Sequence, residues 1–404
     1  MKTGTQIWFD RVVGKSLAYS LNVFVRLAGF ILRPNHALDR PFKTIAVCKY
    51  KGMGSIVQAT PLLQTLKASY PEARIIFITT PANVAIIQKT GLCHEIIVIR
   101  DKSIFTLLSS IFKALGRMWK LRIQVYFDLE IYSHFSSLMT TLSMARNRFG
   151  FYLRSGNYRM GIYTHMMFYN IKAPVSSVYL QMASMLPLKK VITDLYNLNQ
   201  DKEQIKGERP QKYLVINPNA SDLRVERRWP AENFIQLIRI LLEKTPYQIT
   251  FIGSRSEQEY VEQIAKNFKE NSRVINKAGQ TGFDELITTI SQAEAMITND
   301  TGPMHLAFSV RCPVVALFGP CSPAQYGQGG VTIPLYKNLY CSPCVHEFIV
   351  PPCKGNNTCM KEIQVEEVFN ALEMALSGDF KKSEIEKVMY LSKDTSIVAG
   401  KVVR

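Results

Sequence analysis

A turn that joins an apolar run to a helix carries the clearest binding chemistry in the sequence. After the apolar run the chain reads Asn-Asp-Thr-Gly-Pro. Asn299 or Asp300 can cap the N-terminus of a helix, and Pro303 suits its first turn. The free backbone N–H groups at Thr301 and Gly302, with the positive end of the helix dipole, would then bind a diphosphate. An ordinary capped helix uses the same residues, so the turn alone leaves both interpretations open.

Four of the eight cysteines lie close together near the C-terminal end. Cys341 and Cys344 form a Cys-x-x-Cys pair, which Cys353 and Cys359 follow. This grouping allows a zinc or iron–sulfur site. The second pair lacks the Cys-x-x-Cys spacing and the loop holds three prolines, so reduced cysteines, with or without a local disulfide, are the alternative. The remaining cysteines stand singly, which indicates a reducing compartment.

The composition is that of a globular chain with an excess of positive charge. Of the 404 residues, 47% are hydrophobic, which excludes a disordered or collagen-like chain and predicts two domains. The net charge of +17 predicts an anionic partner: nucleic acid, phospholipid or a phosphorylated substrate. Because the basic residues are dispersed and lack interleaved aromatic residues, nucleic acid is the weakest of these partners.

Residues 1–40 contain an apolar, aromatic segment with one cationic stripe. On a helix, Arg11, Lys15, Asn22, Arg26 and Arg33 fall within about 60° of one another. We expect a helix in a membrane interface with its basic face toward anionic headgroups. The alternatives are a helix packed on the protein's own core and, less favoured, a transmembrane anchor. No clear membrane span or secretory signal is visible in the sequence.

Beyond residue 41, short apolar runs alternate with amphipathic stretches, which predicts an α/β fold with parallel sheets. The expected strands of the first half are 44–48, 73–79, 95–99 and 124–129. A second series of strands starts at residue 212, after a polar stretch typical of a linker. Open α/β sheets bind ligands at the carboxyl ends of their strands, so we expect the site there, in a cleft between the two domains.

Three motifs, taken in order, resemble the heptosyltransferase-type glycosyltransferases of family 9. Residues 300–305 read Asp-Thr-Gly-Pro-Met-His and are followed by a Pro-x-x-x-Leu-Phe-Gly run at 313–319. Residues 216–234 are similar to the family's loop that ends in Lys-Arg-Trp-Pro. Residues 47–67 are similar to its N-terminal glycine loop and Thr-Pro-Leu-Leu helix. The resemblance extends over about residues 43–375.

The resemblance implies a GT-B fold of two Rossmann-like domains facing a central cleft, with a sugar nucleotide on the C-terminal domain. Arg227 and Arg228 would stabilise the leaving diphosphate in place of a metal ion, through charge-assisted hydrogen bonds. For these arginines the alternative is a solvated loop. Asn219 is expected to bind the donor, and Gly253 and Glu257 are expected near the nucleoside, with Glu257 accepting from the ribose hydroxyls. For Glu257 the alternative is an exposed helix residue.

The same resemblance assigns the remaining donor residues. Thr301, Gly302 and His305 are expected on the donor, and Asp300 joins the two arginines among the catalytic candidates. No metal ion and no cofactor are expected.

The sequence departs from the family pattern at the glycine loop. Family members usually end this loop in Gly-Asp, and the Asp is taken as the general base. Here Gly52 is followed by Gly54 and Ser55, and a neutral serine cannot act as that base. Glu130, after the strand that ends in Asp-Leu-Glu, is the expected replacement, with His134 as a less favoured candidate. The alternative for Glu130 is a structural partner of Arg146, Arg148 or Arg154.

These observations predict an inverting, metal-independent glycosyltransferase that moves a sugar, with ADP-heptose favoured, onto a lipopolysaccharide-type or other surface-glycolipid acceptor. The alternative is a non-catalytic sugar-nucleotide-binding protein. Positive charge gathers in the first half of the chain and would either line the acceptor side or be scattered in solvent; it comes from Lys49, Lys51, Arg146, Arg148, Arg154 and Arg159. We expect a cytoplasmic protein, peripheral on the inner face of the cell membrane.

We expect five segments along the chain. They are a membrane-interface segment 1–40, an acceptor-binding domain 41–195, a linker 196–211, a nucleotide-sugar-binding domain 212–375 and a C-terminal helix or tail 376–404.

Overall fold

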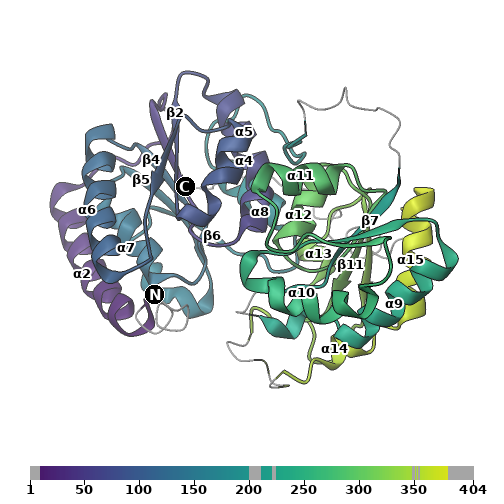
Figure 1. Ribbon diagram of the computed structural model, residues 1–404. Coiled ribbons are helices and arrows are strands. Elements are labelled where there is room, and N and C mark those ends of the chain that lie inside the picture. Colours follow the sequence, from purple (N-terminus) through teal and green to yellow (C-terminus); the bar gives the residue numbers. More distant parts are fainter. Residues whose placement is uncertain are drawn as a thin grey trace. The chain divides into compact units, whose positions relative to one another are not determined.

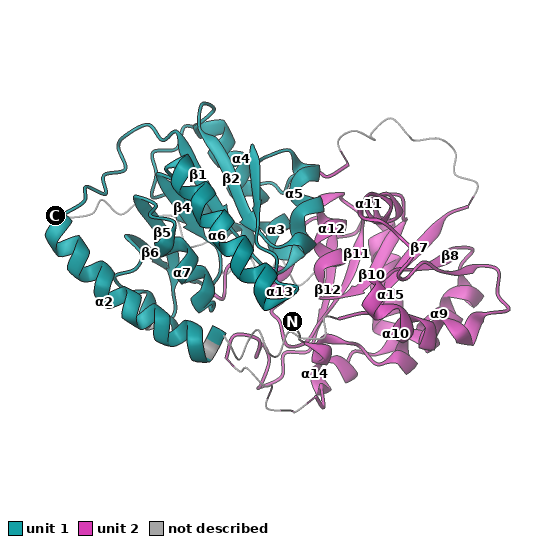
Figure 2. Ribbon diagram, turned by 60° about the vertical axis from the view of Figure 1, so that its left-hand side comes forward, with its two compact units in different colours: residues 1–170, 175–196 teal, residues 171–174, 197–404 magenta. Residues whose placement is uncertain are grey.

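The computed structural model describes residues 10–199, 211–220, 224–347, 351, 353 and 355–380. It divides into two compact units, one of residues 1–170 and 175–196 and the other of residues 171–174 and 197–404 (Figure 2). Most of the expected linker and the possible helix within the C-terminal tail lie outside the described residues.

Unit 1 is a six-stranded parallel sheet covered by helices (Figure 1). Its strands are β1 Thr44–Cys48, β2 Arg74–Thr79, β3 Glu95–Val98, β4 Val125–Asp128, β5 Asn147–Tyr152 and β6 His165–Phe168. Its helical segments are η1 Asp10–Gly14, α2 Lys15–Leu32, α3 Met53–Gln58, α4 Thr60–Ser69, η2 Pro81–Asn83, α5 Val84–Thr90, α6 Ile104–Leu121, α7 His134–Leu142, η3 Arg154–Arg159 and α8 Val175–Ala183.

Unit 2 is a second six-stranded parallel sheet with its own helices. Its strands are β7 Tyr213–Asn217, β8 Gln248–Phe251, β9 Val274–Asn276, β10 Ala295–Asn299, β11 Val314–Phe318 and β12 Thr332–Tyr336. Its helical segments are η5 Val225–Arg227, α9 Ala231–Lys244, η6 Arg255–Glu257, α10 Gln258–Ala265, η7 Lys266–Phe268, α11 Phe283–Ser291, α12 Gly302–Ser309, α13 Pro323–Tyr326, α14 Thr358–Lys361 and α15 Val365–Ser377.

Both sheets have the same strand order, which is that of the Rossmann fold. Unit 1 runs β3-β2-β1-β4-β5-β6, and unit 2 runs β9-β8-β7-β10-β11-β12. All neighbours pair in parallel. The order reverses between β1 and β4 in unit 1 and between β7 and β10 in unit 2, and ligands bind such sheets outside these switch points. The predicted α/β class with two Rossmann-like domains is therefore confirmed.

The central strands are apolar because helices cover both faces of each sheet. β1 and β10 are buried along nearly their whole length. The edge strands are less buried, and Pro334, which has no backbone N–H to donate, is tolerated in β12 because β12 is an edge strand. The four expected strands of the first half are present, three of them shortened by one or two residues.

The N-terminal helix α2 is present, but two residues of its polar stripe, Asn22 and Arg26, bind the protein. Asn22 is buried and donates Nδ2 to the backbone oxygens of Tyr158 and Met160, both at 2.6 Å. Arg26 donates Nη2 to the same Met160 oxygen at 2.7 Å. The prediction that the whole basic stripe points toward headgroups is wrong at these positions, because the backbone carbonyls of the 158–160 loop bind it.

The apolar side of α2 is exposed instead of packed on the core. Val12–Leu32 is long and apolar enough to cross a membrane, judged by length and composition only. Its large hydrophobic residues are mostly exposed, Phe30 and Ile31 by about three quarters. The first alternative, a helix packed on the protein's own core, is met in part, because α2 packs on α7 with Ala18 and Asn22 buried while its apolar side stays exposed.

Close packing of β5 against Tyr163 gives a test of the unit 1 core. A Cβ added at Gly150 would lie 2.5 Å from the Tyr163 ring, whose side chain is buried. We expect Gly150→Ala to lower the free energy of unfolding by about 1–3 kcal/mol through overpacking. The matched control is Gly116→Ala in α6, where nothing lies within 4 Å. Because alanine favours helix, the control should be neutral or stabilising by up to about 1 kcal/mol, and chemical denaturation measures both. Equal stability of the two variants would contradict this packing.

Candidate functional site

In unit 2, polar side chains gather where the strand order reverses. Asn217 ends β7 and Asn299 ends β10, and these two strands are direct neighbours. Asn217 donates Nδ2 to Thr298 Oγ1 at 2.9 Å and to Thr301 Oγ1 at 2.8 Å. The amide therefore fixes the turn between β10 and α12 to the neighbouring strand.

Asn299 joins the same turn to the loop after β7. Its Nδ2 donates to the backbone oxygens of Pro218 and Asn219, and its Oδ1 accepts from the Trp229 backbone N–H at 3.1 Å. All three segments are buried here. The Asn299 side chain thus joins two loops through hydrogen bonds and is not the helix cap that the sequence suggested.

The helix after β10 does present its N-terminus at this edge of the sheet. α12 begins at Gly302, and its N-cap residue is Thr301, which makes no capping hydrogen bond through its side chain. The expectation that Asn299 or Asp300 caps the helix is therefore wrong. The reason is that β10 runs through Asn299 and the helix begins only at Gly302, so neither residue stands at the cap position. The Thr301 hydroxyl accepts from Asn217, and the first N–H groups of a helix have no partners inside it.

Arg227 lies beside Asp300. Its Nη1 is 3.3 Å from the Asp300 backbone oxygen and 3.5 Å from the carboxylate Oδ2. Asp300 is buried, and its backbone N–H donates to Leu317. Within the described residues, Arg227 Nε is buried and has no hydrogen-bond partner, and neither has Asp300 Oδ2. Buried polar atoms of this kind normally have partners, so they mark a place where a ligand can bind.

Arg228 lies in a different environment from its neighbour. Its guanidinium lies over the ring of Tyr260, 4.2 Å from the ring centroid, and its Nη2 donates to the Ala220 oxygen at 3.2 Å. The two arginines are therefore not equivalent, since Arg227 lies at the switch point and Arg228 against α10.

Asn219 and Gly253 lie in contact, whereas Glu257 caps its own helix. A Cβ at Gly253 would lie 2.8 Å from Asn219 Nδ2, so only glycine allows this approach. That amide donates to Asn217 Oδ1 and to the Ile252 oxygen, both at 2.9 Å. Glu257 Oε2 accepts from the backbone N–H and the hydroxyl of Ser254. The carboxylate is thus occupied by a capping box.

His305 is buried inside α12 and uncharged at neutral pH. Burial lowers its pKa to about 4, against the effect of Asp300. Its ring meets Phe308 edge to face at 5.4 Å between centroids. It therefore contributes shape and a neutral ring to this site, and no positive charge.

In unit 1 the glycine loop follows β1 at the corresponding switch point. Gly52 has φ +90°, a left-handed conformation that favours glycine, and caps α3. Gly54 is buried in the first turn of α3. Ser55, in the same turn, hydrogen-bonds Tyr179, whose pKa burial raises. Neither hydroxyl is ionised at neutral pH, so this corner of the loop holds no base.

Glu130, which lies just after β4, binds the glycine loop through hydrogen bonds. Its Oε2 accepts from Lys49 Nζ at 2.8 Å, and its Oε1 accepts from the backbone N–H groups of Tyr50 and Lys51 at 2.8 and 3.2 Å. Burial alone would raise the pKa of this carboxyl, but Lys49 and the two N–H groups lower it below its ordinary value. Its partner is Lys49, whereas Arg146 and Arg148, two of the arginines named as the alternative, bond to backbone oxygens elsewhere.

A buried ion pair lies under Glu130. Asp128 at the end of β4 accepts from Tyr163 and lies 3.7 Å from Arg159 Nη2, and both charged side chains are fully buried. Burial raises the pKa of Asp128, against the effect of Arg159. Arg159 was expected to line the acceptor side, and this is wrong because its guanidinium is enclosed by the core.

The other arginines of that expectation also lie elsewhere. Arg146 precedes β5 and donates Nε to Asn35 O at 2.7 Å. Arg148 donates to Ile162 O and Ala145 O. Both are at the amino ends of the strands, whereas Lys49 and Lys51 are at the carboxyl edge. The side chain of Arg154 lies outside the described residues.

His134, the second candidate base, ties the N-terminal segment to α7. Its backbone N–H donates to Asp10 Oδ2 at 3.1 Å, and its Nδ1 lies 3.4 Å from the same oxygen. Its ring stacks on Tyr158 at 4.2 Å between centroids. These contacts give His134 a structural role.

The cysteines are free thiols in this structure. Cys341, Cys344, Cys353 and Cys359 form no disulfide. Within the described part of the chain, no group of three or more His, Cys, Asp or Glu side chains is arranged to hold a metal ion. Burial raises the pKa of Cys359 to about 11, so that thiol is protonated at neutral pH.

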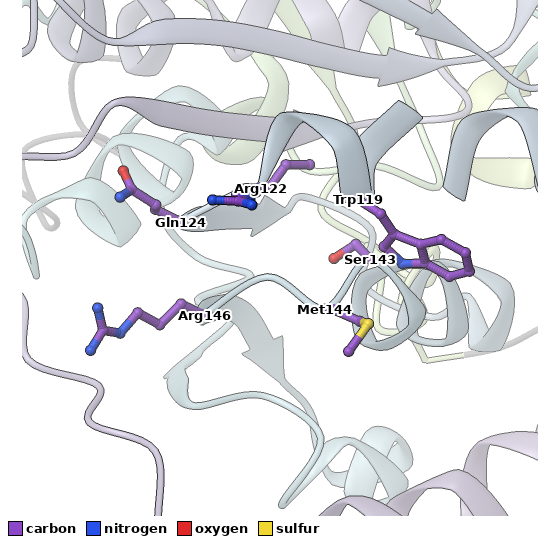
Figure 3. Close-up of a pocket in the computed structure, with 7 residues that line it drawn as sticks. Trp119, Arg122, Gln124, Ser143, Met144 and Arg146 are labelled. Carbon is purple, nitrogen blue, oxygen red and sulfur yellow. The ribbon is translucent and has the colours of Figure 1, made fainter. Parts of the chain in front are cut away.

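A pocket of 340 Å³ lies in unit 1, away from the switch point of that unit (Figure 3). Trp119, Arg122, Gln124, Met144 and Arg146 are among its lining residues. It lies at the amino ends of β4 and β5, so it does not belong to the site at the carboxyl edge of unit 1.

Comparison with known proteins decides the family. The profile of glycosyltransferase family 9 (heptosyltransferase) matches residues 145–352, about half of the chain. The chain belongs to glycosyltransferase family 9. The three motifs singled out in the sequence therefore mark a family 9 glycosyltransferase, with the Asp300 turn and the Arg227 loop both inside the matched range.

Relatives of this family 9 protein are lipopolysaccharide heptosyltransferases. It is 26% identical to lipooligosaccharide heptosyltransferase 2 of Campylobacter jejuni, over 81% of this chain and 96% of that protein. The match to lipooligosaccharide heptosyltransferase 2 of Haemophilus ducreyi is 38% identical but spans 29% of that protein's length. The structure of Escherichia coli ADP-heptose lipopolysaccharide heptosyltransferase II has the same fold, with a TM-score of 0.64, 20% identity and coverage of 83% of this chain and 99% of that one.

Sequence reasoning missed Asn217 and underestimated Lys49. Both follow a rule that the sequence does show: each lies at or directly after the carboxyl end of an apolar run, Asn217 closing β7 and Lys49 following β1. A polar residue at this position of a buried strand is the signal that would have found them.

The Glu130–Lys49 pair predicts a pH dependence of stability. Because the pKa of Glu130 is lowered by folding, its stabilisation is complete above the unfolded pKa of about 4.3 and is lost as the pH falls through the lower folded value. We expect Glu130→Gln to cost about 3 kcal/mol near pH 7, and this difference should shrink below about pH 4.3. Melting midpoints of both proteins between pH 3 and pH 8 measure it. Glu373→Gln, at an exposed position of α15, is the control. A difference that stays constant with pH would show that the pair is not ionised as described.

Proposed function

We propose that this family 9 protein transfers heptose from ADP-heptose to a lipopolysaccharide-type glycolipid, with inversion and without a metal ion. The observation that carries the proposal is Arg227 beside Asp300 and the N-terminus of α12, at the switch point of unit 2. The similarity to heptosyltransferases, among them the Escherichia coli ADP-heptose enzyme, supports heptose and ADP as parts of the donor.

Unit 2 has the charges that a diphosphate needs. The Arg227 guanidinium and the first N–H groups of α12 would bind the phosphate oxygens, with hydrogen bonds to charged groups contributing about 1.5–3 kcal/mol each. As the bond to the sugar breaks, the diphosphate gains negative charge, which these donors stabilise. Arg228 is proposed as the second arginine that donates hydrogen bonds to this diphosphate. A divalent cation is not required when fixed cations perform this task.

Unit 1 supplies the general base in this proposal. Glu130 takes the proton of the acceptor hydroxyl as the hydroxyl oxygen bonds to the anomeric carbon, while the bond from that carbon to the ADP oxygen breaks. Attack opposite the leaving group inverts the anomeric centre. The lowered pKa of Glu130 keeps it ionised at neutral pH, as a base must be.

One observation favours a second candidate, a protein that binds sugar nucleotides without transferring the sugar. Ser55 replaces the usual acid of the glycine loop, and both Glu130 oxygens already accept hydrogen bonds. In this alternative Glu130 only holds the glycine loop.

We also propose that the protein is cytoplasmic and attached to the inner face of the cell membrane. The exposed apolar side of α2 supports attachment, because a large apolar surface is unfavourable in water. A membrane-bound glycolipid acceptor would then lie at the same surface as the enzyme.

A panel of nucleotide sugars tests the donor site. In EDTA, ADP-heptose should raise the melting midpoint more than UDP- or GDP-sugars, with a gain near 2.7 kcal/mol at 100 times its Kd. Arg227→Met should weaken ADP-heptose binding about tenfold or more. The control Arg239→Met changes an exposed arginine of α9 and should bind normally. Unchanged affinity in Arg227→Met, or a requirement for a divalent cation, would overturn this donor site.

The base is tested by turnover. If Glu130 is the base, Glu130→Gln should lower kcat by about 10²–10⁴-fold while ADP-heptose still raises the melting midpoint. Lys49→Met should retain turnover and shift the acid limb of kcat/KM to higher pH, because it removes the main cation that lowers the Glu130 pKa. Wild-type turnover in Glu130→Gln would remove Glu130 from the mechanism. Donor binding without transfer by the wild-type protein would favour the non-catalytic alternative.

A further inference from the structure

Helix α2 of unit 1 contacts the protein with its polar side and exposes its apolar side. A surface helix of a soluble protein buries its apolar side, but α2 uses the buried Ala18 and Asn22 and the side chain of Arg26 to contact the protein. Gly161, with φ +97°, lets the 158–160 loop approach Arg26 closely. The helix is therefore held at its middle by polar contacts while its apolar side stays exposed.

Helix α6 exposes a second apolar row in the same unit. A capping box between Ser103 and Thr106 starts the helix, and Ala114, Leu115 and Met118 bury its inner side. The outer side has large apolar residues at helical spacing that are about half exposed or more. They are Ile104, Phe105, Leu108, Phe112 and Trp119.

The two helices are linked through α7. α2 packs against α7, and Trp119 near the end of α6 donates Nε1 to the Leu142 oxygen at the end of α7 at 2.7 Å. Figures 1 and 2 show α2, α6 and α7 within unit 1. We call the exposed sides of α2 (15–32) and α6 (104–121) the two-helix surface.

The charged residues of the two helices that form this surface are all basic. Neither helix contains Asp or Glu. Lys113 and Lys120 are exposed on α6, and Lys15 is exposed at the start of α2. At the end of α6, the pocket of Figure 3 adds Arg122 and Arg146 next to Trp119. An apolar surface with basic residues and tryptophan is the composition that binds anionic lipid bilayers.

We propose that the two-helix surface docks unit 1 flat on an anionic lipid bilayer, with α6 contributing as much as α2. This deepens the membrane attachment proposed above, because it names the second helix and the lipid charge. The helix α2 lies in the interface instead of crossing the bilayer, since Asn22 and Arg26 bind the 158–160 loop from its middle. A second copy of the chain fits less well, because its identical surface would bring like charges together.

Vesicle binding of the full chain tests the contribution of α6. The probe is co-sedimentation with vesicles of phosphatidylcholine alone and of phosphatidylcholine with phosphatidylglycerol. The variant Phe105→Ser/Phe112→Ser leaves α2 unchanged. The matched control Val191→Ser/Tyr340→Ser removes two exposed apolar side chains that lie outside the two-helix surface.

The wild type should bind anionic vesicles at least tenfold more tightly than neutral ones. Phe105→Ser/Phe112→Ser should raise the apparent Kd for anionic vesicles at least tenfold, and the control should bind like the wild type. Lys113→Glu/Lys120→Glu should reduce binding to anionic vesicles and leave binding to neutral ones unchanged.

Three results would overturn the proposal. They are wild-type binding by Phe105→Ser/Phe112→Ser, an equal loss in the control, and a dimer without lipid that this variant converts to monomers in size-exclusion chromatography. Each variant must also show the wild-type melting midpoint shift with ADP-heptose. If no protein shows that shift but the vesicle results hold, the donor assignment fails and the two-helix surface stands.

Discussion

Parallel strand pairing at two switch points is the constraint on which the described chemistry depends. β1 pairs with β4, and β7 pairs with β10, so the carboxyl ends of strands distant in sequence meet at one edge. Because helices cover both faces of these four central strands, polar side chains that bind a ligand can lie only at the strand ends. Glu130 and Lys49 meet in this way in unit 1, and Asn217 and Thr301 meet in unit 2.

The two units use this edge differently. In unit 1 the two carboxylate oxygens of Glu130 accept hydrogen bonds at this edge, which ties the glycine loop to the end of β4 and lowers the pKa of Glu130. Unit 2 leaves buried polar atoms of Arg227 and Asp300 without partners in the described residues. For this reason unit 2 is suited to bind an anion. In unit 1 the bonded carboxylate instead holds the glycine loop in position. This division agrees with the proposed separation of donor and acceptor.

The outer surface of unit 1 has an apolar side that the protein itself does not cover. Polar groups on α2 are used for contacts with the protein, and apolar groups face outward. Such an arrangement is favourable only if something other than water covers the apolar side. The basic residues beside this surface add attraction to an anionic partner and disfavour self-association.

The sequence determined the fold class, the two units and the family, because alternating apolar runs, glycine turns and ordered motifs are local properties of the chain. It also located Asp300, Arg227 and the glycine loop at strand ends. Tertiary structure alone decided the partners: Lys49 for Glu130, the enclosed position of Arg159 and the inward face of α2. These are contacts between residues about 80, 30 and 140 positions apart, which pairing and packing in three dimensions create, and no local pattern specifies them.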